Sequence, residues 1–209
     1  MEGWDGLGVL KSLKVNTHLS KKPKNEMSKQ VLFIQGGGEG GHAADIPMVN
    51  SLRHNLGSAY NVEYPELESD ESASDFGWIQ QIHDKVSEVE TDMIIIGHSL
   101  GASMILKFLS EHPITSKIKA VFLISAPFWS GNEDWKAGLK LRPGFAEKLP
   151  QKLPIFFYHC RDDQEVTFDH LDTYKKNISQ ATFREIKSGG HLLGNDLSVV
   201  ANDIKAINF

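Results

Sequence analysis

The segment that decides the fold, Asp92 to Leu109, reads D-M-I-I-I-G-H-S-L-G-A-S-M-I-L-K-F-L. Its first part, Met93 to Ile96, is a run of apolar residues short enough to form a strand that is buried on both faces of a sheet. The pentapeptide G-H-S-L-G follows at residues 97–101. Apolar residues then recur at the spacing of one helix face, and they are Leu100, Met104, Ile105, Phe108 and Leu109.

A strand, a glycine-flanked serine and a helix in this order predict a nucleophile elbow, a sharp turn that presents Ser99 above the C-terminal edge of a sheet. Gly97 and Gly101 fit this turn because a side chain at either position would crowd the neighbouring strand or helix. The helix that begins at the turn directs its positive end toward charge that develops at Ser99. The alternative is an ordinary strand-to-helix turn with a solvated serine.

The composition is that of a single globular domain with a sizeable core, since 40% of the 209 residues are hydrophobic and 23% are charged. The net charge of -5 and the lack of a basic, aromatic-rich patch argue against a nucleic-acid partner. Cys160 is the only cysteine, so an intrachain disulfide is excluded, which fits a reducing compartment. There is no apolar run near the roughly 20 residues of a membrane span and no signal-peptide core. We therefore expect a cytoplasmic protein without a membrane partner.

Residues 1–28 differ from the rest of the chain because they are polar, rich in lysine and without sustained periodicity. We expect them to be a flexible N-terminal extension, or the product of a start assigned upstream of Met27. A short strand or helix docked on the domain is the alternative. Residues 29–209 are predicted to form one domain.

Short apolar runs alternate with segments of helical periodicity through this domain. The predicted strands are residues 31–35, 60–64, 93–96, 120–125, 154–159 and 182–186. The predicted helices are residues 46–56, with Pro47 near the first turn, 75–89, the segment from the elbow to Pro113, 168–177 and 195–207. This alternation predicts right-handed crossovers and an α/β fold, a three-layer α/β/α sandwich with a mostly parallel sheet of about six strands. Residues 126–152 form the longest irregular connection, and their large aromatic side chains indicate either a flap beside a site or a covering loop.

A glycine-rich loop, G-G-G-E-G-G at residues 36–41, follows the first predicted strand. Such a loop frees backbone N–H groups to face a ligand or an oxyanion. It lacks the G-K-[ST] ending of a P-loop. We interpret it as an oxyanion loop, with a nucleotide-cradling loop and a plain flexible turn as alternatives.

Several polar residues follow predicted strands, where parallel sheets bind their ligands. Ser99 would become a nucleophile once a base removes its proton, and His191 can accept that proton because imidazole titrates near neutral pH. A carboxylate from the segment after the fifth strand would hold the far ring nitrogen. Two backbone N–H groups must bind the oxyanion, and we expect Leu100 and Gly37 to supply them.

Three motifs carry a resemblance to a known family. The elbow G-H-S-L-G-A, the segment H-C-R-D-D-Q-E-V at 159–166 and the S-G-G-H that ends at His191 resemble a compact serine hydrolase of the α/β-hydrolase fold. The chain order serine, acid, histidine is the order of that superfamily. Over residues 29–209 the chain is similar to small members without a large cap, the dienelactone-hydrolase-like and retinoblastoma-binding-protein-9-like serine hydrolases.

The resemblance implies which carboxylate is the acid. The family segment usually reads H-G-x-x-D-x-x-V-P, which implies Asp163, with Asp162 and Glu165 as alternatives. This chain departs from the pattern at Cys160, which replaces a glycine, and at Gln35, where many members have histidine.

The implied activity is that of a serine hydrolase, in the carboxylesterase and thioesterase class, that cleaves an ester or related acyl bond of a small molecule through an acyl-serine intermediate. We expect the catalytic residues Ser99, Asp163 and His191, substrate contacts from His98 and Trp129, and no cofactor or metal ion, because no metal-ligand motif occurs. The alternative is a non-catalytic ligand-binding or protein-interaction protein that retains the hydrolase fold.

Overall fold

A computed structural model describes residues 28–38, 40–113 and 116–207, so nearly all of the predicted N-terminal extension lies outside the described residues. The described chain forms a six-stranded sheet in the order β2-β1-β3-β4-β5-β6, in which every neighbouring pair is parallel. The strands are β1 (Lys29–Ile34), β2 (Tyr60–Glu63), β3 (Met93–His98), β4 (Ile118–Ile124), β5 (Ile155–Cys160) and β6 (Thr182–Ile186). The prediction of a parallel sheet of about six strands is therefore confirmed.

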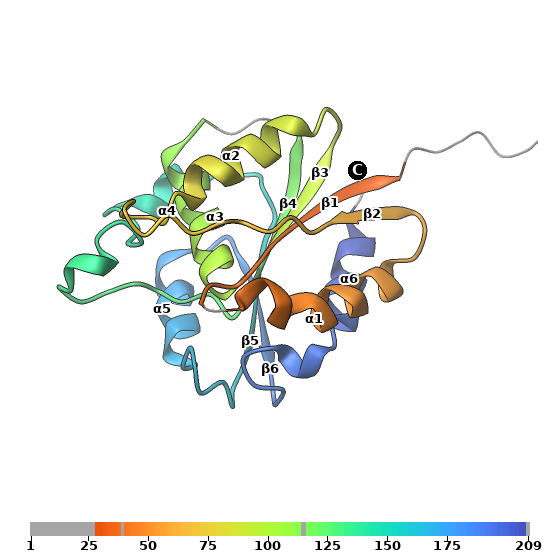
Figure 1. The fold of residues 1–209 in the computed structure, drawn as a ribbon. Coiled ribbons are helices and arrows are strands. Elements are labelled where there is room, and N and C mark those ends of the chain that lie inside the picture. Colours follow the sequence, from red (N-terminus) through yellow and green to blue (C-terminus); the bar gives the residue numbers. More distant parts are fainter. Residues whose placement is uncertain (1–27, 39, 114–115, 208–209) are drawn as a thin grey trace, which may run out of the picture.

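Helices cover both faces of this sheet and make three layers (Figure 1). One face packs against α1 (Gly41–Leu56) and α6 (Ser198–Ala206). The other packs against α2 (Trp78–Glu88), α3 (Ser99–Glu111), α4 (Phe145–Lys148) and α5 (Asp169–Asn177). Strand β1 shows the cause, because Val31 and Phe33 face one hydrophobic cluster while Leu32 and Ile34 face the other.

The first helix begins earlier than predicted. It starts at Gly41 instead of residue 46, so Pro47 lies inside the helix and not in its first turn. Gly40 adopts a left-handed conformation with φ 73° and ends the glycine loop there. The proline ring cannot donate a hydrogen bond to the Ala43 carbonyl, but its exposed position limits the cost. The prediction was wrong because the glycine run masks a helix start that depends on tertiary contacts.

Two other predicted segments are more structured or shorter than expected. The predicted helix at 195–207 is shorter, since α6 begins only at Ser198, and the 3₁₀ turn η2 (Leu193–Asn195) precedes it. The long connection at 126–152 contains the 3₁₀ turn η1 (Asp134–Lys136) and α4. Among the described residues, no helix is long and apolar enough to cross a membrane.

Candidate active site

The turn from β3 to α3 has a strained backbone. Strand β3 ends at His98 and α3 begins at Ser99, whose φ is 49°. A left-handed conformation is uncommon for a residue with a side chain and persists only where surrounding contacts enforce it. Ser99 thus has the strained backbone expected of a nucleophile elbow, between the C-terminal end of a central strand and the N-terminus of a helix.

The two glycines of the turn have no room for a side chain. A Cβ on Gly97 would lie 2.7 Å from the Ala102 nitrogen, and one on Gly101 would lie 2.3 Å from the Gln35 carbonyl oxygen. Both contacts are with backbone atoms, which cannot swing away. The close approach of α3 to β1 and β3 thus requires glycine at both positions.

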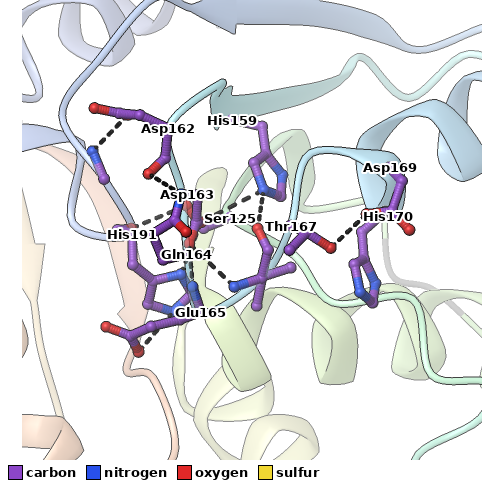
Figure 2. A network of polar contacts seen from close by, with 12 residues as sticks. Ser125, His159, Asp162, Asp163, Gln164, Glu165, Thr167, Asp169, His170 and His191 are labelled. Carbon is purple, nitrogen blue, oxygen red and sulfur yellow. Dashed lines mark hydrogen bonds and ion pairs between the residues drawn. The ribbon is translucent and has the colours of Figure 1, made fainter.

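A histidine and a carboxylate meet beside this turn. His191 Nδ1 lies 2.9 Å from Asp163 Oδ2, and both side chains are buried (Figure 2). Asp163 follows β5 and His191 follows β6, so the parallel sheet brings the two loops to one edge. With Nδ1 held by the carboxylate, Nε2 is the ring nitrogen that is available for proton transfer.

Several donors keep Asp163 ionised. Its Oδ1 accepts the N–H groups of Glu165 at 2.9 Å and Val166 at 3.0 Å. His159 Nε2 lies 3.4 Å from Oδ2. Burial alone would raise the pKa of Asp163, but the hydrogen bonds from His159, His191 and the Val166 N–H together outweigh burial and hold the pKa well below its usual range.

The loop that carries His191 is fixed through its backbone. Asp162 accepts the N–H groups of Gly189 at 3.2 Å and Gly190 at 2.9 Å. The Ser125 hydroxyl donates to the His191 carbonyl at 2.9 Å. Asp162, one of the two alternative acids, thus holds the loop and not the imidazole ring.

Ser99 and His191 line one cleft of about 130 Å³, together with Gly36, Gly37 and His98. Among the described contacts no hydrogen bond joins Ser99 to His191, and such bonds are often loose before substrate binds. A Cβ on Gly37 would lie 2.6 Å from the Leu100 side chain. The glycine loop therefore packs against the residue that follows Ser99, which places the two predicted oxyanion donors, Gly37 and Leu100, beside each other.

A second cavity of about 370 Å³ adjoins the cleft, and its lining includes Phe128, Trp129 and Trp135. The Trp129 indole N–H donates to Ser103 Oγ at 2.9 Å. The Trp135 ring packs edge-on against the Trp129 ring, with 5.8 Å between the ring centroids. Glu165 lines both cavities, and its Oε2 lies 3.9 Å from His191 Nε2. The segment 126–152 thus contributes an aromatic groove beside the cleft.

Sequence reasoning missed one buried carboxylate in this region. Asp45 in α1 is only 1% exposed; its Oδ1 lies 2.8 Å from His98 Nδ1 and its Oδ2 accepts the Gly36 N–H at 2.8 Å. A signal was present, because Asp45 stands at helical spacing from the buried Met48, Val49 and Leu52. An acidic residue on the apolar face of a helix predicts a buried partner.

The thiol of Cys160 is shielded from solvent. The side chain is fully buried in the hydrophobic cluster between the sheet and the helices α1 and α6. Burial, and secondarily the charges of Asp162 and Asp163, raise the pKa of its thiol to about 11. The thiol is therefore protonated at neutral pH and is a weak nucleophile.

The six-stranded parallel sheet with helices on both faces is the α/β-hydrolase fold. The profile of the serine hydrolase family matches residues 49–196, so the chain belongs to this family. Comparison with curated protein sequences gives no significant match.

Solved structures share the fold at low sequence identity. The esterase domain of a Rhodothermus marinus protein is 16% identical with a TM-score of 0.62, over 86% of this chain and 87% of that one. Est1E from Butyrivibrio proteoclasticus, in a structure with ferulic acid bound, is 17% identical with a TM-score of 0.62, over 89% and 91% of the two chains. The thioesterase domain from the curacin biosynthetic pathway is 17% identical with a TM-score of 0.63, over 87% and 92% of the two chains.

Proposed function

We propose that this protein hydrolyses a carboxylic ester or a related acyl bond through an acyl-serine intermediate. The observation that carries the proposal is the 2.9 Å contact between His191 and a buried carboxylate in the cleft that Ser99 also lines. Nucleophile, base and acid have no common purpose in a protein that only binds a ligand. Family membership and the esterase and thioesterase neighbours support the same class of reaction.

In the proposed mechanism Ser99 Oγ attacks the acyl carbon while His191 Nε2 takes the hydroxyl proton. Asp163 stabilises the imidazolium that forms. The N–H groups of Leu100 and Gly37 bind the oxyanion of the tetrahedral intermediate. When the intermediate collapses, the bond to the leaving alcohol breaks and the alcohol oxygen takes the proton from His191. A water molecule, deprotonated by His191, then hydrolyses the acyl-serine and restores the enzyme.

The two cavities indicate where the acyl group and the alcohol of the substrate would bind. The cleft of about 130 Å³ is smaller than the neighbouring cavity of about 370 Å³ and has room for a short acyl group. His191 Nε2 returns its proton to the leaving oxygen. Glu165, whose Oε2 lies 3.9 Å from this nitrogen, also lines the aromatic groove, so the groove begins beside the leaving oxygen. We therefore assign the groove to the leaving alcohol and expect esters of short acids with aromatic or apolar alcohols.

The central test is covalent labelling with a fluorophosphonate, read by intact mass. We expect one adduct on the wild-type protein and none on Ser99→Ala, because the reagent captures only an activated serine. His191→Ala should label at least 100-fold more slowly, since general base catalysis contributes about 10²–10⁴-fold. Circular dichroism of the three proteins checks that the fold is intact.

A well-folded wild-type protein that takes up no adduct would contradict the proposal. That outcome favours the alternative, a binding protein that keeps the hydrolase fold, which predicts saturable ligand binding without covalent capture. An adduct that persists on Ser99→Ala would assign the nucleophile to another residue.

The groove assignment predicts a change in substrate preference. Trp135→Ala should raise KM for 1-naphthyl acetate up to about tenfold, because an aromatic contact contributes about 0.5–1.5 kcal/mol. KM for ethyl acetate should stay the same, since its alcohol does not reach the exposed Trp135 ring. Steady-state kinetics with the two acetates measure both effects, and equal changes for both esters would remove the groove from the substrate site.

A further inference from the structure

A second pair of a carboxylate and a histidine borders the cleft. Asp45 is 1% exposed and His98 is 3% exposed, and His98 Nδ1 lies 2.8 Å from Asp45 Oδ1. The two residues come from α1 and from the end of β3, more than fifty positions apart in the chain. The proposed mechanism does not use either side chain.

The pair joins two parts of the site through their backbones. Asp45 Oδ2 accepts the N–H of Gly36, the first residue of the glycine loop, at 2.8 Å. On the other side, His98 Nε2 lies 3.2 Å from the His191 carbonyl oxygen. One continuous set of contacts therefore runs from the glycine loop to the peptide that carries the His191 imidazole.

Each ring nitrogen of His98 faces one partner. A carbonyl oxygen can only accept, so Nε2 carries a proton. Nδ1 faces a carboxylate at 2.8 Å, although no described residue offers it an aligned hydrogen bond, so this contact is mainly electrostatic. A buried carboxylate needs close polar partners, and Asp45 has the His98 ring at one oxygen and the Gly36 N–H at the other.

Packing leaves this pair little freedom. A Cβ on Gly36 would lie 2.9 Å from His98 Nδ1, so the glycine loop rests directly on the imidazole. The His191 loop contains Gly189 with φ 140° and Gly190 with φ 61°, so its path depends on contacts such as those with Asp162 and with His98. A rigid buried pair on one side of a glycine-rich loop is suited to fixing the position of that loop.

We propose that Asp45 and His98 form a positioning pair that fixes the glycine loop relative to the backbone of His191. This role rests on the proposed function, in which the loop supplies an oxyanion donor and His191 is the base. The pair acts through these two backbones and touches neither the acyl carbon nor the transferred proton. A misplacement of either backbone would raise the barrier to reaction with little change in substrate affinity.

The test compares Asp45→Asn, His98→Phe and the double variant. Asp45→Asn keeps the shape and an acceptor for Gly36, and the double variant leaves no unpaired buried charge, so both should fold. Because small misplacements of reacting groups cost up to about 10²-fold, we expect kcat for 1-naphthyl acetate to fall about 10–100-fold, with KM within about twofold. The double variant should lose no more activity than the more impaired single variant, since the two residues act as one unit.

Tyr158→Phe is the matched control. It removes a partly buried hydrogen bond, at 2.6 Å to Asp203, from a residue that does not line the cleft. This control should lower the melting temperature and leave kcat unchanged. Unchanged kcat in folded Asp45→Asn and in the double variant, or losses that simply multiply, would overturn the positioning role.

Fluorophosphonate labelling of the same proteins separates this proposal from the proposed function. If the wild-type protein labels and Ser99→Ala does not, equal labelling rates for wild type and the pair variants overturn the positioning role alone. If the wild-type protein does not label, the proposed function and the positioning role fail together. Slower labelling of Asp45→Asn at an unchanged melting temperature supports the proposal.

Discussion

Replacement of Asp163 by asparagine should lower kcat about 10⁴-fold, the effect typical of the loss of the acid from a serine triad. An asparagine side chain cannot stabilise the imidazolium, and its amide group can donate to Nδ1 and stabilise the wrong tautomer of His191. The Oδ1 contacts with the Glu165 and Val166 N–H groups are retained by an asparagine carbonyl oxygen, so the loop should keep its shape. Single-turnover kinetics with 1-naphthyl acetate measure the loss.

Asp169→Asn is the control for this prediction. Asp169 begins α5 a few residues further along the chain, is exposed, and hydrogen-bonds Thr167. We expect its kcat to equal that of the wild-type protein. A loss below about tenfold in Asp163→Asn would show that a different carboxylate orients the base, because removal of the orienting acid typically costs thousands-fold.

Replacement of Gly101 by alanine should destabilise the fold by at least about 3 kcal/mol, at or above the upper end of the usual cost of overpacking. The new Cβ would meet the carbonyl oxygens of Gln35 at 2.3 Å and Ile34 at 2.8 Å. Relief of these contacts requires α3 to move away from β1, which would also displace Ser99. Urea unfolding followed by circular dichroism measures the change in free energy.

Gly144→Ala separates crowding from backbone strain. Gly144 is left-handed, with φ 74°, and an added Cβ would meet only the flexible Glu147 side chain, at 3.9 Å. Its cost should be about 1–2 kcal/mol, the penalty of a left-handed conformation alone. Equal losses for the two substitutions would mean that the contact between α3 and β1 is less tight than the glycine at 101 indicates.

The sheet could be predicted from sequence because each strand carries a local signal. Strand β3 is a buried apolar run, as expected of a central parallel strand. Strand β6, T-F-R-E-I, is a partly exposed edge strand, and its predicted bounds of 182–186 are nevertheless the observed ones. The start of α1 could not be predicted in this way. Its first residues, G-H-A-A-D, continue a glycine run, and the sequence does not reveal the tertiary contacts of this turn, such as Asp45 with His98 and the His42 carbonyl with the Tyr64 hydroxyl.

In the candidate site, too, the residues marked by a local motif could be predicted, whereas contacts between distant segments could not. Ser99 is marked by a contiguous motif, and His191 by the glycines before it. The choice among Asp162, Asp163 and Glu165 rested on a family resemblance, because adjacent carboxylates in a loop differ only in the direction of their side chains. The catalytic roles of these residues remain predictions that the labelling and kinetic experiments test. The sequence around Asp45 did not reveal that its partner is His98, since the two residues lie on different elements.

The position of β6 has a consequence for the order in which the protein becomes active during synthesis. This edge strand pairs only with β5, and the loop that follows it carries His191. A chain that has emerged as far as β5 already contains the elbow and the glycine loop but not the proposed base. Under the proposed mechanism, Ser99 would therefore gain its base only once β6 has paired with β5.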